Sequence, residues 1–294
     1  MKKIDPHHHL WDLSKNQYSW LTSPVETNFL GNYQPLQKNY LLTDYLHDCA
    51  NQQIEKSVHI QAGYNRLNCV DETRWLQSIA DQHGFPHGIV AYANLAAPNL
   101  EEMLKAHCQF PNMRGIRQCL NWHIDPYYKD CEENFIDQPQ WQKGFALLEK
   151  YNLSFDMQIY PDQMISALSL AKQYPHIAII IDHIGMPLWH DEINIKLWQE
   201  RLAMLSTYKN VYIKLSGFGM IKHDWSIDDI KPYVKFVIET FGTDRCMFAS
   251  NFPVDGSYTS FDQLYNAYQI IASDLNKIEQ ENLFYNNAQR IYRL

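Results

Sequence analysis

The sequence contains no apolar run long enough to cross a membrane, which takes about 18 residues. Met1-Lys2-Lys3 is followed by no apolar segment, so no signal peptide is expected. No block of Lys and Arg occurs, and the formal net charge is −8. Nucleic acids and anionic membranes attract clustered basic residues, so neither is an expected partner.

Paired cysteines are also missing. The 6 cysteines are scattered, and no Cys-x-x-Cys pair occurs. In a chain of 294 residues this pattern predicts reduced, mostly buried thiols in a cytoplasmic protein. Nothing in the sequence selects one of them as a reactive thiol.

Strand-like and helical patterns alternate along the whole chain. The strands are predicted at 3–10, 56–62, 88–94, 113–120, 154–160, 177–183, 211–216 and 245–251, and helices at 44–53, 72–82, 99–107, 139–151, 161–173, 194–206, 226–241, 260–271 and 277–292. Eight such repeats predict an α/β fold: a single (β/α)8 TIM barrel over residues 1–294, with additional C-terminal helices. An open doubly wound sheet would normally carry a Gly-x-Gly-x-x-Gly turn after its first strand, and none is present.

The sequence also predicts two helix caps and two functional loops. Thr43 and Asp71 are the expected N-caps of the helices that follow them. The long aromatic segments at 11–40 and 121–137 are expected to form a lid or pocket wall, because long loops in compact domains are usually functional.

Three consecutive histidines stand in the first predicted strand. Alternation along a strand places His7 and His9 on one face and His8 on the other. Two imidazoles on one face can bind a metal ion or an anionic substrate group. A leftover purification tag is the alternative, but the run is short and lies within strand-like sequence.

Other polar residues fall near the ends of later predicted strands, where a barrel enzyme has its active site. They are His59, Gln61, Arg117, Gln158, Asp182, His183, Lys214, Ser216, Ser250 and Asn251. Alternation predicts that His183 shares a face with Ile181 and that Asp182 points the other way. A single buried histidine is often only a hydrogen-bonded core residue. The joint occurrence of His-x-His and a later histidine favours a site.

Four segments together resemble the amidohydrolase-related family (amidohydrolase 2). They are IDPHHHLWD at 4–12, DHIGMP at 182–187, KLSG at 214–217 and FASNFP at 248–253. The resemblance is to the lactonase-like branch, which includes sugar-acid lactonases and pyrone-dicarboxylate lactonase. It implies a TIM-barrel hydrolase that opens a lactone ring. Some relatives bind a divalent metal, here expected to be zinc, and some lactonases work without one.

The resemblance also implies roles for individual residues. His7, His9 and His183 match the metal-binding histidines, and Arg117 matches a basic residue that would clamp a substrate carbonyl or carboxylate. Gln158, Trp11 and Lys214 are further predicted substrate contacts. The cationic Arg117 and Lys214 favour a substrate with negative charge, such as a sugar-acid lactone or a dicarboxylate.

One position departs from the family pattern, because Asn251 stands where an Asp general base is usual. An amide cannot accept a proton at neutral pH. Either Asp255 or a histidine replaces the base, or a bound metal acidifies the water, or the protein only binds its ligand. Loss of the carboxylate would also weaken the metal site, which could then be empty or partly occupied.

The expected activity is therefore water attack on the carbonyl of a small sugar-acid or carboxylated lactone, with His183, Asn251 and Asp255 as catalytic residues. A decarboxylase-type lyase and a catalytically silent small-acid binding protein are the alternatives. The expected partner is a small-molecule substrate. The particular substrate, the metal and any homo-oligomer are left open by the sequence.

Overall fold

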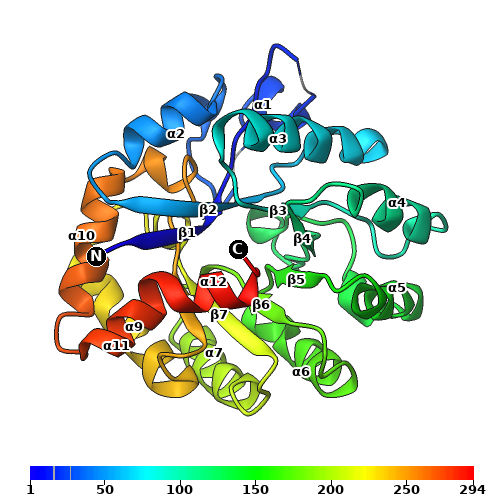
Figure 1. The fold of residues 1–294 in the computed structure, drawn as a ribbon. Coiled ribbons are helices and arrows are strands. Elements are labelled where there is room, and N and C mark those ends of the chain that lie inside the picture. The colour runs from blue at the N-terminus through cyan, green and yellow to red at the C-terminus, as the bar shows by residue number, and fades with distance from the viewer. Residues whose placement is uncertain (16, 27) are drawn as a thin grey trace.

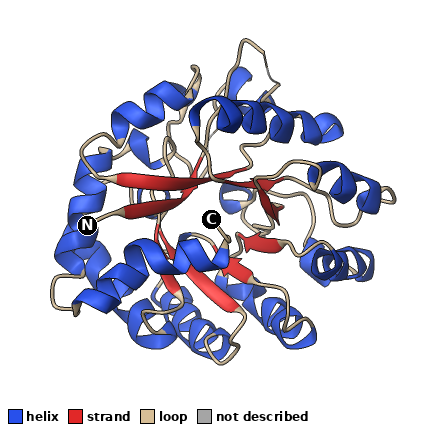
Figure 2. Ribbon diagram, viewed as in Figure 1, coloured by secondary structure: helices blue, strands red, loops and turns tan. Residues whose placement is uncertain are grey.

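The computed structural model describes residues 1–15, 17–26 and 28–294. Eight strands form one parallel sheet in the order β1 to β8, and the helices surround it as an outer ring (Figures 1 and 2). The predicted (β/α)8 barrel is confirmed. The strands are β1 Lys3–His8, β2 Ile54–Ile60, β3 Gly88–Ala91, β4 Met113–Arg117, β5 Ser154–Met157, β6 Ile179–Ile181, β7 Val211–Leu215 and β8 Cys246–Phe248.

The outer layer consists of α-helices joined by short turns of helix. The α-helices are α1 Ser19–Thr22, α2 Leu42–Asp48, α3 Cys69–His83, α4 Leu100–His107, α5 Pro139–Lys150, α6 Met164–Gln173, α7 Glu192–Leu205, α8 Phe218–Ile221, α9 Ile227–Phe241, α10 Phe261–Ile271, α11 Lys277–Glu281 and α12 Asn287–Ile291. The short turns are η1 Gln34–Leu36, η2 Arg66–Asn68, η3 Pro126–Tyr128, η4 Phe135–Asp137, η5 Pro161–Gln163, η6 His183–Gly185, η7 Asp255–Ser257 and the π-helical η8 Asn282–Asn286. Within the described ranges, none of these helices combines the length and apolarity that a membrane span requires.

Two predicted helix caps are wrong. The N-cap of α2 is Leu41, whose backbone N–H donates to the Asp44 side chain at 2.8 Å. Helix α3 already begins at Cys69, which puts Asp71 inside the first turn. In both cases an acidic side chain stabilises the helix start from within the first turn, where the exposed N–H groups attract negative charge.

The core has two layers because the side chains of each strand alternate in direction. The outer layer packs strand residues such as Ile179 and Ile181 against the surrounding helices. The inner layer fills the barrel with Ile4, Val58, Ile60, Val90, Ile180 and Met247, packed against Ala288, Ile291 and Tyr292. Helix α12 therefore lies across one end of the barrel (Figure 1). All six cysteines are free, and four are buried.

The barrel closes between β1 and the end of β8 through a buried carboxylate. Asp5 accepts hydrogen bonds from the Ser250 backbone at 2.9 Å, the Ser250 hydroxyl at 2.6 Å and the Tyr45 hydroxyl at 3.0 Å. Beyond it, Asn251 N donates to His7 O at 2.8 Å and His9 N to Phe252 O at 2.8 Å. This seam fixes the backbone of the histidine segment against that of Asn251.

Candidate active site

A cavity of about 1290 Å³ opens at the carboxyl ends of the strands. Its buried polar lining comes from seven residues on or directly after six different strands: His9, Gln61, Arg117, Gln118, Gln158, His183 and Asn251. The predicted pocket-wall segments do line it, through residues such as Trp20 and Phe29 from the first and Lys129 and Glu132 from the second. The cavity is therefore polar at its floor and mixed at its rim.

The three consecutive histidines divide as alternation predicts. The ring centroids of His7 and His9 lie 5.0 Å apart. His8 points away, stacks on Tyr45 at 4.1 Å and hydrogen-bonds Ser57 through Nε2 at 3.0 Å. His8 is therefore a packing residue, whereas His9 lines the cavity and the fully buried His7 lies next to it.

His9 has a tautomer that follows from its backbone contact. Its Nδ1 lies 2.8 Å from the carbonyl oxygen of Ile60, which can only accept, so Nδ1 carries the proton. Burial lowers the pKa of His9 well below its usual value, and the ring is neutral at pH 7. Nε2 is then an acceptor, and it lies 3.4 Å from the Asn251 side-chain oxygen, which is also an acceptor. Both atoms are open to a donor or a cation.

The chain leaves β6 through left-handed backbone, which brings two neighbouring side chains to the same place. His183 and Ile184 have φ of 53° and 50°, and the His183 ring lies 4.6 Å from that of His7. Asp182 also faces the barrel interior, with Oδ1 3.3 Å from His7 Nδ1. Asp182 points away from Ile181, as predicted, but the prediction that His183 shares the face of Ile181 is wrong, because it assumed that the strand continues through residue 183.

Gly217 permits this position of His183. Its φ is +76°, and a Cβ added there would lie 2.6 Å from Cβ and Cγ of His183. Ser216, the preceding residue, hydrogen-bonds His183 Nδ1 through its hydroxyl at 3.0 Å. The loop after β7 thus holds the imidazole by contact on one side and by a hydrogen bond on the other.

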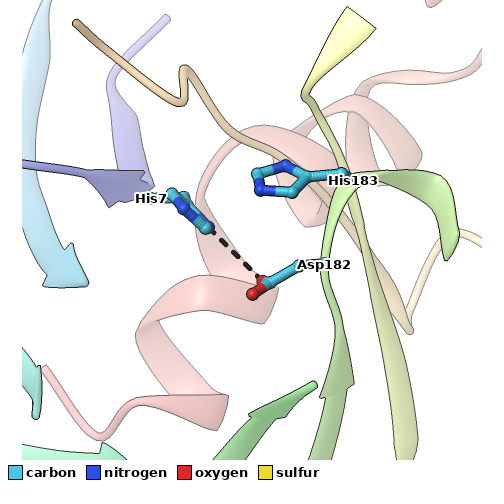
Figure 3. Close-up of side chains that lie close together, drawn as sticks. All are labelled: His7, Asp182 and His183. Carbon is cyan, nitrogen blue, oxygen red and sulfur yellow. Dashed lines mark ion pairs between the residues drawn. The ribbon is translucent and has the colours of Figure 1, made fainter. Parts of the chain in front are cut away.

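His7, Asp182 and His183 form a fully buried cluster whose ligand atoms lie within 4.8 Å of one another (Figure 3). Among the described residues, His7 Nε2 and both Asp182 oxygens have no hydrogen-bond partner. Imidazole nitrogen and carboxylate oxygen are ligands that zinc accepts. The residues therefore fit a divalent metal. Asp182 is an additional candidate ligand beside the predicted His7, His9 and His183. The sequence did not predict it, because alternation put His183 and Asp182 on opposite faces.

Lys214 lies in the interior of the barrel and not on the cavity wall. It is fully buried, forms an ion pair with Asp182 at 3.1 Å, hydrogen-bonds Asp156 and lies 3.1 Å from His7 Nδ1. Burial alone would raise the pKa of Asp182, but the Lys214 charge holds it well below its usual value. The structure thus brings Lys214 to the histidine cluster, away from the position expected of a substrate contact.

Arg117 and Gln158 meet on the cavity wall. Arg117 donates to Gln61 O at 2.6 Å and to Gln158 Oε1 at 3.2 Å, and its buried Nε has no partner among the described residues. Trp11 does not reach the cavity, because it is fully buried and donates to Lys38 O at 2.7 Å. The tryptophan that lines the cavity is Trp20, which donates to Ala62 O at 2.8 Å.

Asp255 lies behind Asn251 and not on the cavity wall. Its carboxylate accepts from Gly217 N at 3.1 Å and from Asn251 Nδ2 at 3.3 Å. Burial raises the pKa of Asp255 to about 7, against the opposing effect of these hydrogen bonds. Burial also lowers the pKa of His183 to about 3, so this ring is neutral at pH 7. Among the buried polar side chains that line the cavity, Arg117 is therefore the charged one, and Asp255 reaches the cavity only through Asn251.

Known proteins resemble this chain over its full length. The amidohydrolase family model matches residues 4–294. An uncharacterized protein of Sinorhizobium fredii is 41% identical over 99% of this chain and 98% of its own length. An L-fucono-1,5-lactonase of Burkholderia multivorans is 25% identical over 99% of this chain and 96% of its own.

Solved structures show the same fold. The crystal structure of a Burkholderia multivorans amidohydrolase with bound zinc superposes with a TM-score of 0.83 at 24% identity, and the match covers 100% of both chains. The family match spans both the histidine cluster and the Asn251 segment. The chain therefore belongs to the amidohydrolase family.

Proposed function

We propose that this protein hydrolyses the lactone of a small sugar acid, by attack of water on the ring carbonyl at the floor of the cavity. The observation that carries the proposal is the convergence of neutral His9 and His183 with cationic Arg117 on one buried polar wall. Relatives named L-fucono-1,5-lactonase and L-rhamnono-gamma-lactonase support a lactone substrate.

Arg117 is the proposed site of carbonyl or carboxylate binding. Two of its nitrogens donate to Gln61 O and Gln158, which orients the guanidinium on the cavity wall, and its buried Nε has no partner in the described part of the chain. A donor held in place before the reaction stabilises negative charge that develops on the carbonyl oxygen. Gln158 contributes by holding Arg117 and offers its own amide to the hydroxyl groups of the substrate.

His183 is the proposed acceptor of the water proton. Its ring is neutral, lines the cavity and is oriented by Ser216. Asn251 lines the same wall and positions the water through its amide. Asp255 touches neither the water nor the substrate in this scheme. It acts as a positioning residue, because its carboxylate holds the Asn251 amide.

His7, Asp182 and His183 would hold a divalent metal ion, with His9 next to them. With a metal bound, His183 would be a ligand and not the acceptor of the water proton. A metal bound there supplies Lewis-acid polarisation and lowers the pKa of a bound water. The remaining groups keep the roles given above: Arg117 binds the carbonyl side of the substrate, and Asn251 orients the polar group nearest to it.

A panel of five- and six-membered aldonolactones, with acid release followed by a pH indicator, tests the proposal. Metal content by elemental analysis and activity before and after chelation are measured on the same preparation. Turnover should fall to background in a His7→Ala, His183→Ala double variant and persist in His176→Ala, an exposed matched control. Full turnover in the double variant would remove the assigned site.

The same panel separates the other activities. A decarboxylase-type lyase would release carbon dioxide from aromatic or carboxylated acids and leave every lactone intact. A silent binding protein would bind a small acid tightly, with no turnover of any substrate. Either result contradicts lactone hydrolysis by this chain.

A further inference from the structure

Lys214 is surrounded by three polar groups inside the barrel. Its ammonium hydrogen-bonds Asp156, lies 3.1 Å from Asp182 Oδ1 and lies 3.1 Å from His7 Nδ1 in hydrogen-bond geometry. Asp156 is held from the other side by the Tyr292 hydroxyl, which donates to it at 2.6 Å. All of these side chains are fully buried. Their contacts place a fixed positive charge directly against the histidine cluster.

The contact between Lys214 and His7 determines where the imidazole carries its proton. An ammonium group has three donors and no acceptor, so the nitrogen that faces it must offer a lone pair. Nδ1 of His7 is that nitrogen, and a neutral imidazole then carries its proton on Nε2. Asp182 Oδ1 is 3.3 Å from the same Nδ1 and is itself paired with the Lys214 ammonium at 3.1 Å. The contact of Nδ1 with Lys214 is the shorter of the two and has hydrogen-bond geometry.

We propose that Lys214 is a positioning residue that holds His7 in its Nε2–H form and thereby weakens the binding of a divalent cation to His7, Asp182 and His183. A cation at Nδ1 would have to displace the lysine. A cation at Nε2 requires the proton there to leave, and if that proton moves to Nδ1, two N–H groups face each other at 3.1 Å. Both routes break the hydrogen bond between Lys214 and His7.

The positive charge of Lys214 also weakens metal binding to the cluster. Lys214 already neutralises Asp182, which is the one carboxylate in the cluster. A metal ion would have to share this carboxylate with the Lys214 ammonium, which repels the ion. Burial strengthens the repulsion between the two cations because little water screens their charges. The lysine thus acts as an internal competitor for the metal's own ligands.

Zinc affinity of the full chain, measured by competition with a chromophoric chelator, tests the proposal. Because Lys214→Met alone leaves buried carboxylates unpaired, it is combined with Asp156→Asn, and Asp156→Asn alone is the matched control. The double variant should bind zinc at least tenfold more tightly than the control. An unchanged or weaker affinity would overturn the proposal.

A second measurement needs no folded lysine variant. In metal-free wild-type protein labelled with ¹⁵N-histidine, the ring nitrogens of His7 are assigned by their loss in His7→Gln. Their shifts should show a proton on Nε2 and a lone pair on Nδ1. A proton on Nδ1 would contradict the inference. It concerns the cluster of the proposed hydrolysis, but neither readout needs turnover, so it can fail or hold independently of that activity.

Discussion

The side-chain amide of Asn251 donates to the carboxylate of Asp255 across 3.3 Å. This contact separates the only carboxylate of the β8 loop segment 249–257 from the cavity, because Asn251 lines the wall and Asp255 lies behind it. An acidic group at position 251 would face His9, whereas the one at 255 faces an amide. The consequences can be measured at each position.

Replacement of Asn251 by Asp puts two carboxylates in contact. Repulsion between them should raise the pKa of the pair and lower the free energy of unfolding at pH 8 by roughly 3 kcal/mol. The new carboxylate also adds an anionic ligand beside His9, so zinc affinity should increase. Urea unfolding and chelator competition give the two values. Asn286→Asp, at an exposed position, is the control, and equal behaviour of the two variants would contradict the prediction.

Asp255→Asn should change how stability depends on pH. Burial raises the pKa of Asp255 from 3.8 to about 7, so the folded state holds a proton that the unfolded state has lost. Wild-type stability therefore falls relative to the variant as the pH rises from about 4 to 7, by up to about 1.4 kcal/mol per pH unit. Below about pH 4, Asp255 is protonated in both states and does not lower the free energy of unfolding. Above about pH 7, the full cost of burying its charge is present.

Unfolding free energies at pH 5 and pH 8 check the effect of Asp255. The difference in unfolding free energy between wild type and Asp255→Asn should change by about 3 kcal/mol from pH 5 to pH 8. Asp5 and Glu72, whose pKa values burial raises to about 6 and about 7, are present in both proteins and cancel in the comparison. Parallel pH curves for wild type and variant would show that Asp255 does not titrate in this range.

Arg117→Lys keeps the positive charge but loses the planar guanidinium, whose Nη1 donates to Gln158 and whose Nη2 donates to Gln61 O. A lysine presents all its donors from one nitrogen and cannot reproduce this planar two-nitrogen geometry. The value of kcat/KM for a lactone substrate should drop about 100-fold, which corresponds to about 2.7 kcal/mol. Arg114→Lys, on the same strand but bonded to the carbonyls of Pro111 and Met113, is the matched control. A similar loss in both variants would point to the strand and not to the site.

Tyr18→Phe should loosen one wall of the cavity. The Tyr18 hydroxyl donates to buried Glu72 at 3.2 Å, and Glu72 also accepts from Ala62 N at 3.1 Å, which ties the segment before α1 to the end of β2. Loss of the hydroxyl should cost about 1–2 kcal/mol of stability and raise KM more than it lowers kcat. Tyr151→Phe, which removes a remote hydroxyl bonded to Glu101, should leave KM unchanged. A fall in kcat alone would argue against a wall function for Tyr18.

The barrel follows from the sequence because its signal is repeated and local. Eight apolar runs separated by helical patterns leave few other folds, and the observed strands lie within one or two residues of the predicted starts. The predicted strands extend too far at their carboxyl ends. There the chain turns into the loops that carry the site, and apolar periodicity does not report where hydrogen bonding between strands stops.

The side chains of the site were harder to place for one physical reason. Asp182 and His183 meet at His7 because His183 and Ile184 adopt positive φ, and nothing in their residue types requires this. Lys214 and Trp11 were expected at the cavity, but the barrel interior and the Lys38 carbonyl satisfy them instead. Position along a strand predicts which residues approach the centre, whereas depth within the barrel depends on partners from other strands.

Gly217 shows how strongly one missing side chain constrains this site. Every substitution at 217 adds a Cβ that would overlap His183, and every one also has to adopt a left-handed backbone. Positions 183 and 217 lie on different strand ends, yet position 217 cannot change while any residue with a Cβ stands at 183. In lineages descended from a common ancestor, position 217 should therefore stay Gly, and a library that randomises both positions should yield active clones almost exclusively with Gly217.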